Sequence, residues 1–311
     1  MARILGYTHP ACLEHDTGAG HPECADRLGA VLEALHRAFP RMEWIEAPRA
    51  SRGQLLRVHD PRLLATVLAP QPPGQTRLDP DTVVSPGSAE AALRAAGAGV
   101  AATEAVMHGE ADVAFCAVRP PGHHATIEAA MGFCLFDNIA VAAAHALDRF
   151  GLARVAVVDF DIHHGNGTQA IFEQDPRVLY LSSHQAPLFP WSGAANERGA
   201  GNIVNLLLPA GADSETFRRG WREILLPALD AFAPQLLLVS AGFDGDRRDP
   251  LAQVNLVPDD FGWITGELAR LAGRLAEGRI VSMLEGGYDL QALGEGAVAH
   301  VAALLAGPAA A

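Results

Sequence analysis

Short runs of aliphatic and β-branched residues alternate with longer Ala- and Leu-rich stretches along this chain. The short runs are typical of buried strands, and the longer ones have the apolar spacing of helices. The predicted strands are 4–7, 113–118, 155–160, 178–183, 236–240 and 280–284, and the predicted helices lie near 88–108, 137–149, 214–231, 259–277 and 291–305. This alternation indicates βαβ units, hence a mostly parallel sheet with helices on both faces.

Local signals agree with these boundaries. Ser88, Asp137 and Ser214 stand at the starts of helical stretches and are expected to be N-caps. The Pro-rich piece 70–73 and the Gly/Asn-rich piece 193–202 predict loops. No internal repeat or break in composition divides the 311 residues. We therefore expect one three-layer αβα domain spanning residues 1–311.

Polar clusters follow four of the predicted strands directly. They are Arg119-Pro-Pro-Gly-His-His-Ala125, the segment 159–166, Ser240-Ala-Gly-Phe-Asp244 and Glu285-Gly-Gly-Tyr288. Open α/β sheets bind their ligands in the crevice at the carboxyl ends of the strands. Four separate strands are therefore expected to deliver His, Asp and Tyr side chains to one region.

One of these clusters is unusual for a buried strand. Asp159, Asp161 and His163 are spaced i, i+2, i+4, so in an extended chain they project from one face. Uncompensated charges in a buried sheet cost several kcal/mol each, which calls for a cation or a dense hydrogen-bond network. Carboxylate and imidazole together suit a borderline metal such as zinc. The alternative is a polar strand end without a ligand.

Composition describes an ordinary globular protein. Hydrophobic residues make up 49% of the chain and charged residues 19%. No apolar stretch is long enough to cross a membrane, and the N-terminus lacks a secretory signal. The four cysteines form no C-x-x-C pair, which favours reduced thiols in a cytoplasm.

A formal net charge of −13 bears on the partners of the protein. Nucleic-acid binding without sequence preference depends on neutralising phosphates, so this charge argues against it. The charge would instead favour the approach of cationic substrates, such as lysine-rich tails, although it can equally serve solubility alone.

Taken together, the polar strings resemble the zinc-dependent histone deacetylases, in particular the class II and bacterial amidohydrolase branch. The matching strings are RPPGHHA (119–125), GFCLFDNIAVAA (132–143), VDFDIHHGNGTQ (158–169), SAGFD with RRDPL (240–251) and EGGYD (285–289), preceded by His21-Pro22-Glu23 with Asp26-Arg27. The resemblance runs from about residue 5 to 303 and implies the arginase-like fold. "Histone" is here a family label only.

Carried over by position, the resemblance implies one catalytic zinc ion held by Asp161, His163 and Asp244. Two carboxylates and one imidazole leave coordination sites for water and a substrate carbonyl. The resemblance also pairs His123 with Asp159 and His124 with Asn166. An ionised Asp would keep its histidine more basic than a neutral Asn, which suits His124 as the general base and His123 as an electrostatic partner.

The remaining expected roles concern the substrate. Tyr288, preceded by two glycines, would donate to the developing oxyanion. Removal of an acetyl group from the side-chain amine of lysine is the implied reaction. The resemblance makes Phe133 and Phe189 the walls of a tunnel and Gly132 a substrate contact, while Leu251 occupies the position of the Glu gatekeeper of polyamine-selective relatives. A neutral Leu favours acyl-lysine over acetylpolyamine.

The family also implies a structural potassium ion. The positions that match are the backbone carbonyls of Asp159, Asp161 and His163, together with Ser182 and Ser183.

Two other functions stay open on the sequence. A binuclear manganese ureohydrolase shares the implied fold, but it needs further carboxylates directly after the metal-binding His, where this chain has His164, Gly165 and Asn166. A non-catalytic acyl-lysine reader would keep zinc only structurally. The physiological substrate, the acyl length and the oligomeric state are not specified by the residues.

Overall fold

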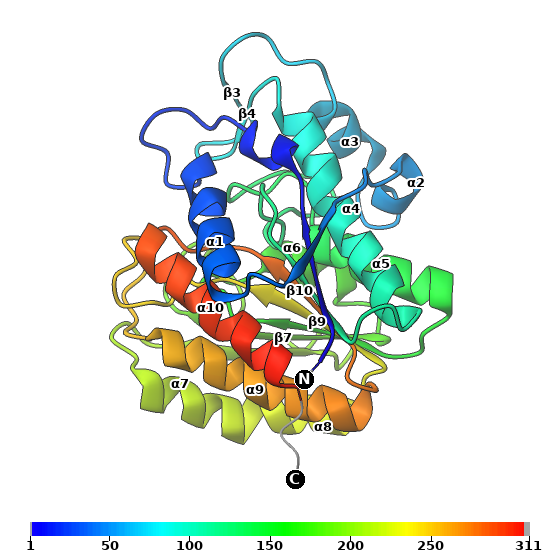
Figure 1. The fold of residues 1–311 in the computed structure, drawn as a ribbon, viewed down its shortest axis with the longest axis vertical. Coiled ribbons are helices and arrows are strands. Elements are labelled where there is room, and N and C mark those ends of the chain that lie inside the picture. Colours follow the sequence, from blue (N-terminus) through cyan, green and yellow to red (C-terminus); the bar gives the residue numbers. More distant parts are fainter. Residues whose placement is uncertain (1, 308–311) are drawn as a thin grey trace.

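The core of the protein is an eight-stranded sheet in which all paired strands run parallel, in the order β2-β1-β5-β10-β9-β6-β7-β8. Figure 1 shows strands β7, β9 and β10 of this sheet near the centre of the molecule. The computed structural model describes residues 2–307. The strands of this sheet are β1 (Ile4–Thr8), β2 (Glu43–Glu46), β5 (Val113–Cys116), β6 (Val155–Asp159), β7 (Val178–Gln185), β8 (Ile203–Leu208), β9 (Leu236–Ala241) and β10 (Ile280–Leu284). A two-stranded antiparallel hairpin, β3 (Thr76–Arg77) with β4 (Val83–Val84), lies apart from it.

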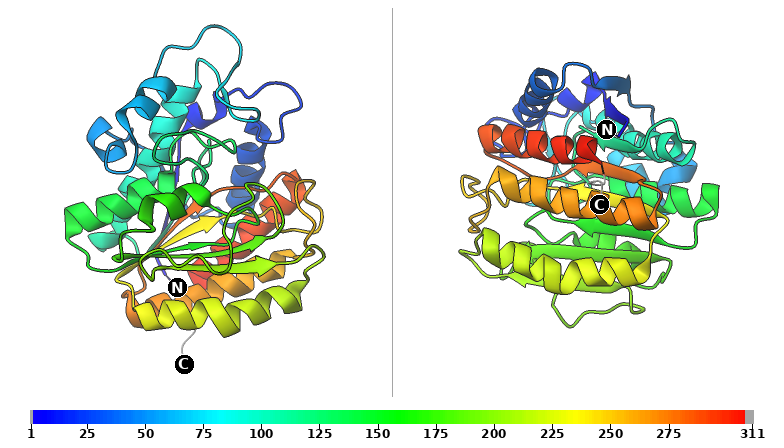
Figure 2. Two further views of the ribbon diagram at one scale, coloured as in Figure 1. Left: turned by 180° about the vertical axis from the view of Figure 1, so that it is seen from behind. Right: turned by 60° about the horizontal axis from the view of Figure 1, so that its bottom comes forward.

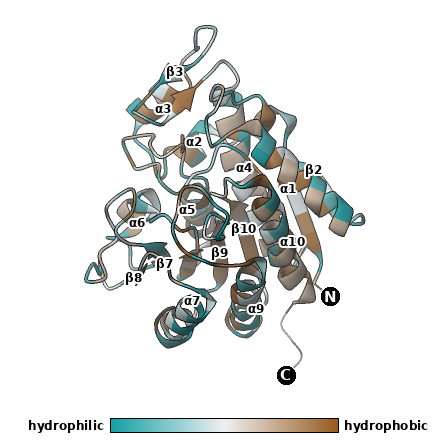
Figure 3. Cartoon of the chain, turned by 90° about the vertical axis from the view of Figure 1, so that its left-hand side faces the viewer, coloured by the Kyte–Doolittle hydropathy of each residue, from teal (hydrophilic) through white to brown (hydrophobic). Residues whose placement is uncertain are grey.

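Helices cover both faces of the sheet (Figure 3). On one face lie α1 (Ala25–Ala38), α10 (Leu290–Ala306), α9 (Pro258–Leu275) and the run α7 (Ser214–Gly220), η2 (Trp221–Leu225) and α8 (Leu226–Phe232). Figure 2 shows α10, α9 and this run side by side from below. On the other face lie α4 (Ser88–Met107) and α5 (Asn138–Phe150). The shorter helices are η1 (Pro10–Leu13), α2 (Arg52–Leu55), α3 (Pro61–Val67) and α6 (Asn166–Phe172).

The central strands are buried on both faces, which explains their nearly continuous apolar sequences. All the residues of β5, β6, β9 and β10 are buried. This is the predicted α/β fold, with helices on each side of a parallel sheet. Among residues 2–307, none of the helices is both long enough and apolar enough to cross a bilayer.

Two of the three expected N-caps are corrected. Asp137 does cap α5, since its side chain accepts from the Ala140 N–H. Ser88 instead lies inside α4, where its hydroxyl accepts from the Ser85 N–H at 2.7 Å. Asp213 caps α7 in place of Ser214, because the Asp213 carboxylate accepts from the Thr216 N–H at 3.0 Å.

Candidate active site

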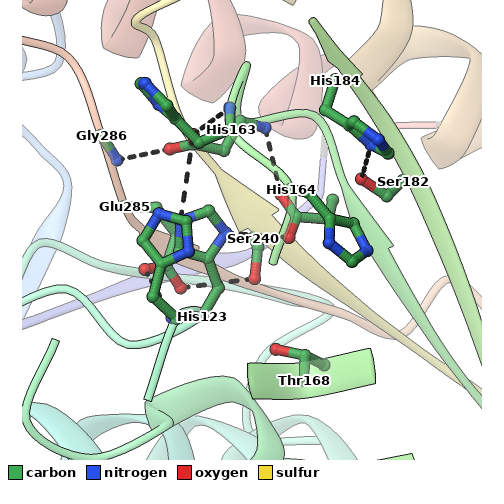
Figure 4. Close-up of polar contacts among 12 residues, drawn as sticks. His123, His163, His164, Thr168, Ser182, His184, Ser240, Glu285 and Gly286 are labelled. Atoms are coloured by element: carbon green, nitrogen blue, oxygen red, sulfur yellow. Dashed lines mark hydrogen bonds and ion pairs between the residues drawn. The ribbon is translucent and has the colours of Figure 1, made fainter. Parts of the chain in front are cut away.

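The four polar clusters converge at the carboxyl ends of the parallel strands. The loops after β5, β6, β9 and β10 carry them, and these four strands are neighbours in the sheet. Figure 4 shows His123, His163 and Glu285 gathered at this edge, beside Gly286. Segments that are far apart in the chain therefore lie together, as predicted from the fact that each of them follows a strand of a parallel sheet.

Asp161, His163 and Asp244 form a compact group of ligand atoms. One atom from each lies within 4.8 Å of the others, and all three residues are buried. His163 Nδ1 lies 2.8 Å from Asp244 Oδ2 and 3.3 Å from Asp161 Oδ1. Two oxygens and one imidazole nitrogen are ligands that zinc accepts, with room left for further ligands. Within residues 2–307 this is the one such cluster of His, Cys, Asp and Glu.

Backbone groups hold both carboxylates in place. The Ile162 N–H donates to Asp244 Oδ1 at 2.9 Å, and the Gly286 N–H donates to Asp161 Oδ2 at 2.8 Å. A Cβ atom at Gly286 would lie 2.4 Å from Asp244 Oδ2, so only glycine lets the backbone come this close. Such outer contacts orient metal ligands and tune their basicity.

The electrostatics of the group favour a positive charge at its centre. Burial alone would lower the pKa of His163, yet the hydrogen bonds and charges of Asp161 and Asp244 raise it to about 10. Burial, followed by the charge of Asp161, raises the pKa of Asp244 to about 7. The two buried carboxylates repel each other, and a bound cation would offset this repulsion. The donor set therefore fits a divalent metal.

The histidine pair is arranged as two separate dyads. His123 Nδ1 lies 2.9 Å from Asp159 Oδ2, and His124 Nδ1 lies 2.9 Å from Asn166 Oδ1. The centres of the two imidazole rings are 4.0 Å apart. Although burial opposes it, the charge of Asp159 raises the pKa of His123 well above its usual value. Burial and the neighbouring His123 charge lower the pKa of His124 well below it, so His124 is neutral and able to accept a proton.

Glu285, the first residue of the EGGYD string, was not predicted as a site residue. Its carboxylate accepts from the N–H groups of Gly122 at 2.7 Å and His123 at 3.2 Å. Its other oxygen accepts from the Ser240 hydroxyl at 3.3 Å. Glu285 therefore ties the histidine loop to the ends of β9 and β10.

Tyr180 is a second residue that the sequence reasoning missed. It is fully buried on β7, and its hydroxyl donates to Asp159 Oδ2 at 3.0 Å. The same oxygen is paired with His123. Tyr180 lies in the predicted strand 178–183, but nothing in the sequence identified Asp159 as its partner.

Two charged residues, Arg27 and Asp249, hold Tyr288 and the turn before it in place. The Arg27 guanidinium lies 4.8 Å from the centre of the ring, and Arg27 donates to the carbonyls of Glu285 and Gly287. The Asp249 carboxylate accepts from the Tyr288 N–H at 2.7 Å. Burial raises the pKa of the Tyr288 hydroxyl well above 10, so it keeps its proton and can donate a hydrogen bond. Arg27 and Asp249 stand in quoted strings, yet neither was given a role.

A cavity of about 210 Å³ opens onto these groups. Its wall contains the predicted tunnel residues, and it also contains Asp81 and Leu188, which the sequence reasoning missed. Phe133 has an edge contact with Tyr288, and Phe189 has one with His124. The residues that line the cavity are Asp81, His124, Gly132, Phe133, His163, Leu188, Phe189, Leu251 and Tyr288.

The residues matched to a potassium site lie on adjoining strand ends. Asp159 and Ser182 are register partners of β6 and β7. Asp161 and His163 follow β6 directly, and the Ser183 hydroxyl accepts from the Trp221 indole N–H at 3.2 Å.

Replacing Gly132 by alanine is expected to lower kcat by about tenfold, because a misplaced catalytic group loses its near-attack geometry. The added Cβ would lie 2.5 Å from the His124 ring, and Gly132 has a φ of +56°. The control is Gly109→Ala, which has a φ of +72° with nothing within 4 Å of the new Cβ. Activity of the Gly132 variant equal to that of the Gly109 control would contradict the inferred clash with the His124 ring.

Comparison with known proteins places this geometry in a family. Residues 21–304 match the family described as the histone deacetylase domain. The chain belongs to the histone deacetylase family. The resemblance inferred from the strings is thereby confirmed, and the chain belongs among deacetylases and amidohydrolases that act on amide bonds.

Individual relatives agree with this assignment. The chain is 44% identical over 279 residues to the histone deacetylase-like amidohydrolase of Pseudomonas aeruginosa, covering 87% of this chain and 73% of the relative. It is 39% identical over 310 residues to the human polyamine deacetylase HDAC10, covering 93% of this chain and 46% of that protein. The crystal structure of the HDA15 HD domain superposes with a TM-score of 0.91 at 35% identity, covering 99% of this chain and 90% of that one. This match confirms the arginase-like deacetylase fold.

Proposed function

We propose that this protein is a zinc-dependent amidohydrolase that removes acyl groups, acetyl above all, from the side-chain amine of lysine in peptides or proteins. One observation carries the proposal. One cavity is lined by His163 of the compact metal-ligand group, by the neutral His124 and by the protonated Tyr288. We further propose that residues 1–311 act as one catalytic domain, in a cytoplasmic setting. The four thiols, which form no disulfide in the described chain, support that setting.

Asp161, His163 and Asp244 would hold the zinc ion, one per chain. When bound, zinc supplies Lewis-acid chemistry, since it polarises a carbonyl group and lowers the pKa of a water molecule. The geometry and the excess of negative charge in this group support the choice of a divalent cation.

His124 would move the proton. Its Nδ1 is engaged by Asn166 Oδ1, so Nε2 is the nitrogen left to receive a proton from the attacking water. As the new carbon–oxygen bond forms and the carbon–nitrogen bond breaks, the same nitrogen returns the proton to the leaving amine. The products are a lysine amine and a carboxylic acid, and the acid then gives its proton to the amine, which leaves an ammonium group and a carboxylate. His123, held by Asp159, would supply positive charge beside this step.

Tyr288 would stabilise the oxyanion that develops on the substrate carbonyl. The ring of Tyr288 packs against the Arg27 guanidinium, and the hydroxyl keeps its proton, so it can donate a hydrogen bond to that oxyanion. A preorganised donor of this kind is worth about 3–4 kcal/mol in the transition state.

The cavity wall bears on the choice of substrate. Phe133, Phe189 and Leu251 give an apolar passage suited to the aliphatic stem of lysine, with Gly132 placed for a substrate contact. An acetylpolyamine or another small acylated amine is the second candidate. It is favoured by an acidic residue, Asp81, in the same wall and by the likeness to a polyamine deacetylase.

Two rival readings are less well supported. A two-metal ureohydrolase would need a further ligand beside His163, but His164 lies against Ser192 and Gln169, at 2.8 Å from each. A non-catalytic reader would have no use for a proton acceptor at His124. The structural potassium ion, bound by the carbonyls of Asp159, Asp161 and His163 with Ser182 and Ser183, is proposed from the family resemblance.

A panel of substrates tests the proposal. Lysine peptides with acetyl and longer acyl groups, and acetylpolyamines, would be assayed with zinc present and after chelation. We expect acetyl-lysine peptides to give the highest kcat/KM, and chelation to abolish turnover. A higher kcat/KM for acetylpolyamines would replace the first candidate by the second. No turnover of any substrate, with zinc bound, would favour the reader.

A further inference from the structure

A second hollow adjoins the active-site cavity. It has a volume of about 430 Å³, twice that of the cavity, and its wall includes Pro187, Leu188, Trp191, Glu197 and Leu207. Leu188 lines both spaces, so they share a wall. We call this space the Trp191 hollow.

The hollow presents apolar surface to solvent. Trp191 is 75% exposed, the highest value among the large exposed hydrophobic residues of the described chain, and Leu207 is 39% exposed. Trp191 also has a φ of +64°, a conformation that costs free energy for a side chain of this size. A strained, exposed aromatic residue contributes little to folding, and such surfaces commonly mark interaction sites.

The loop that carries Trp191 is nevertheless fixed. The Trp191 N–H donates to the Leu188 carbonyl at 2.9 Å. On its inner side, His164 Nδ1 lies 2.8 Å from the Ser192 hydroxyl, and His184 Nε2 lies 3.0 Å from the Gly193 carbonyl. His164 and His184 lie side by side next to His163 (Figure 4), with ring centres 4.7 Å apart. The hollow is thus formed in advance, which reduces the entropic cost of binding.

We propose that the Trp191 hollow receives an apolar, preferably aromatic, side chain that neighbours the acyl-lysine in a peptide substrate. Because Leu188 lines both spaces, a side chain in the hollow and an acyl-lysine in the cavity can belong to neighbouring residues of one peptide. One residue of extended chain spans about 3.3–3.6 Å. Glu197 is the one charged residue in this wall, and its Oε2 accepts from Gln169 at 2.6 Å, so the carboxylate is held in place while most of the wall offers apolar contact. This inference rests on the proposed function and deepens it, since an acetylpolyamine carries no side chain to fill the hollow.

The test compares three substrates: an acetyl-lysine peptide with Phe on either side of the lysine, the same peptide with Gly at those positions, and a blocked acetyl-lysine amide without neighbours. The enzymes are the wild type, Trp191→Ala, Trp191→Phe and the control Ile224→Ala, which changes an exposed residue of η2. We expect the wild type to prefer the Phe peptide by about tenfold in kcat/KM. Trp191→Ala should remove most of this preference while leaving the blocked amide within about twofold, whereas Trp191→Phe and Ile224→Ala should keep it.

Two results would overturn the inference: equal kcat/KM for the two peptides with the wild type, or an equal loss on all three substrates in Trp191→Ala. If no substrate is turned over, the proposed function fails, and the hollow is judged by the binding of fluorescein-labelled peptides. Tighter binding of the Phe peptide that is lost in Trp191→Ala would support the hollow, and equal affinities would overturn it.

Discussion

Replacing His124 by alanine is expected to lower kcat for an acetyl-lysine peptide by about 10²- to 10⁴-fold, the range contributed by a positioned proton-transfer group. The neutral ring, held by Asn166 at 2.9 Å, is the cavity-lining group suited to take the water proton and give it to the leaving amine. The measurement is steady-state turnover together with the zinc content of the same preparation, because a loss of metal would also lower the rate.

His145→Ala is the matched control for this variant. His145 is also buried, with a lowered pKa, but it lies on α5, pairs with Glu104 of α4 and does not line the cavity. We expect this control to turn over near the wild-type rate. Unchanged kcat in His124→Ala with zinc still bound would contradict the assigned proton transfer.

Replacing Tyr288 by phenylalanine is expected to lower kcat by about 10²- to 10³-fold, because one donor to the oxyanion is lost. Since the ring is kept, its contacts with Arg27 and Phe133 should remain. KM should change little, because the hydrogen bond strengthens only as negative charge develops. The measurement is the separate determination of kcat and KM on an acetyl-lysine peptide.

Tyr7→Phe removes a hydroxyl from the buried strand β1 and serves as the control. Its kcat should stay within about twofold of the wild type, because Tyr7 does not line the cavity and makes no contact with the reacting groups. A Tyr288 variant with wild-type kcat would remove the tyrosine from the proposed mechanism.

The buried strands were the most predictable part of the fold. Their continuous apolar runs follow from burial on both faces, and all six predicted strands were found with ends shifted by at most two residues. The edge strands β2 and β8 were missed. The segment Glu43–Glu46 is partly exposed and begins and ends with glutamate, so it lacks the continuous apolar run of a buried strand. In Ile203–Leu208 that run is interrupted by Asn205, and Leu207 is exposed.

Helix α1 was also missed, although its sequence carries a helical pattern. Leu28, Val31 and Leu35 have helical spacing and are fully buried, so its pattern was present. The predicted helix 214–231 is interrupted by a π-helical turn at Trp221–Leu225, next to Gly220 and Pro227, which weaken regular helix.

The candidate site was predictable where it follows strands, because the topology of a parallel sheet brings strand ends together. The pairs His123–Asp159 and His124–Asn166 were expected from the family resemblance and lie at hydrogen-bond distance. The loop residues of the cavity wall were either expected only through the family resemblance, as for Phe133 and Phe189, or missed, as for Asp81 and Leu188. Asp81 reaches the cavity from the β3–β4 hairpin, and Leu188 from the loop after β7, and no sequence period reports where such loops fold back.

Zinc titration of chelator-treated protein tests most directly whether Asp161, His163 and Asp244 form one catalytic metal site. Turnover of an acetyl-lysine peptide would be followed as zinc is added back, with bound zinc measured in parallel. We predict that activity returns in proportion to occupancy and saturates at one zinc per chain, and that Asp244→Asn binds zinc at least about tenfold more weakly. Full activity in the stripped protein, or saturation only at two metal ions per chain, would contradict the account.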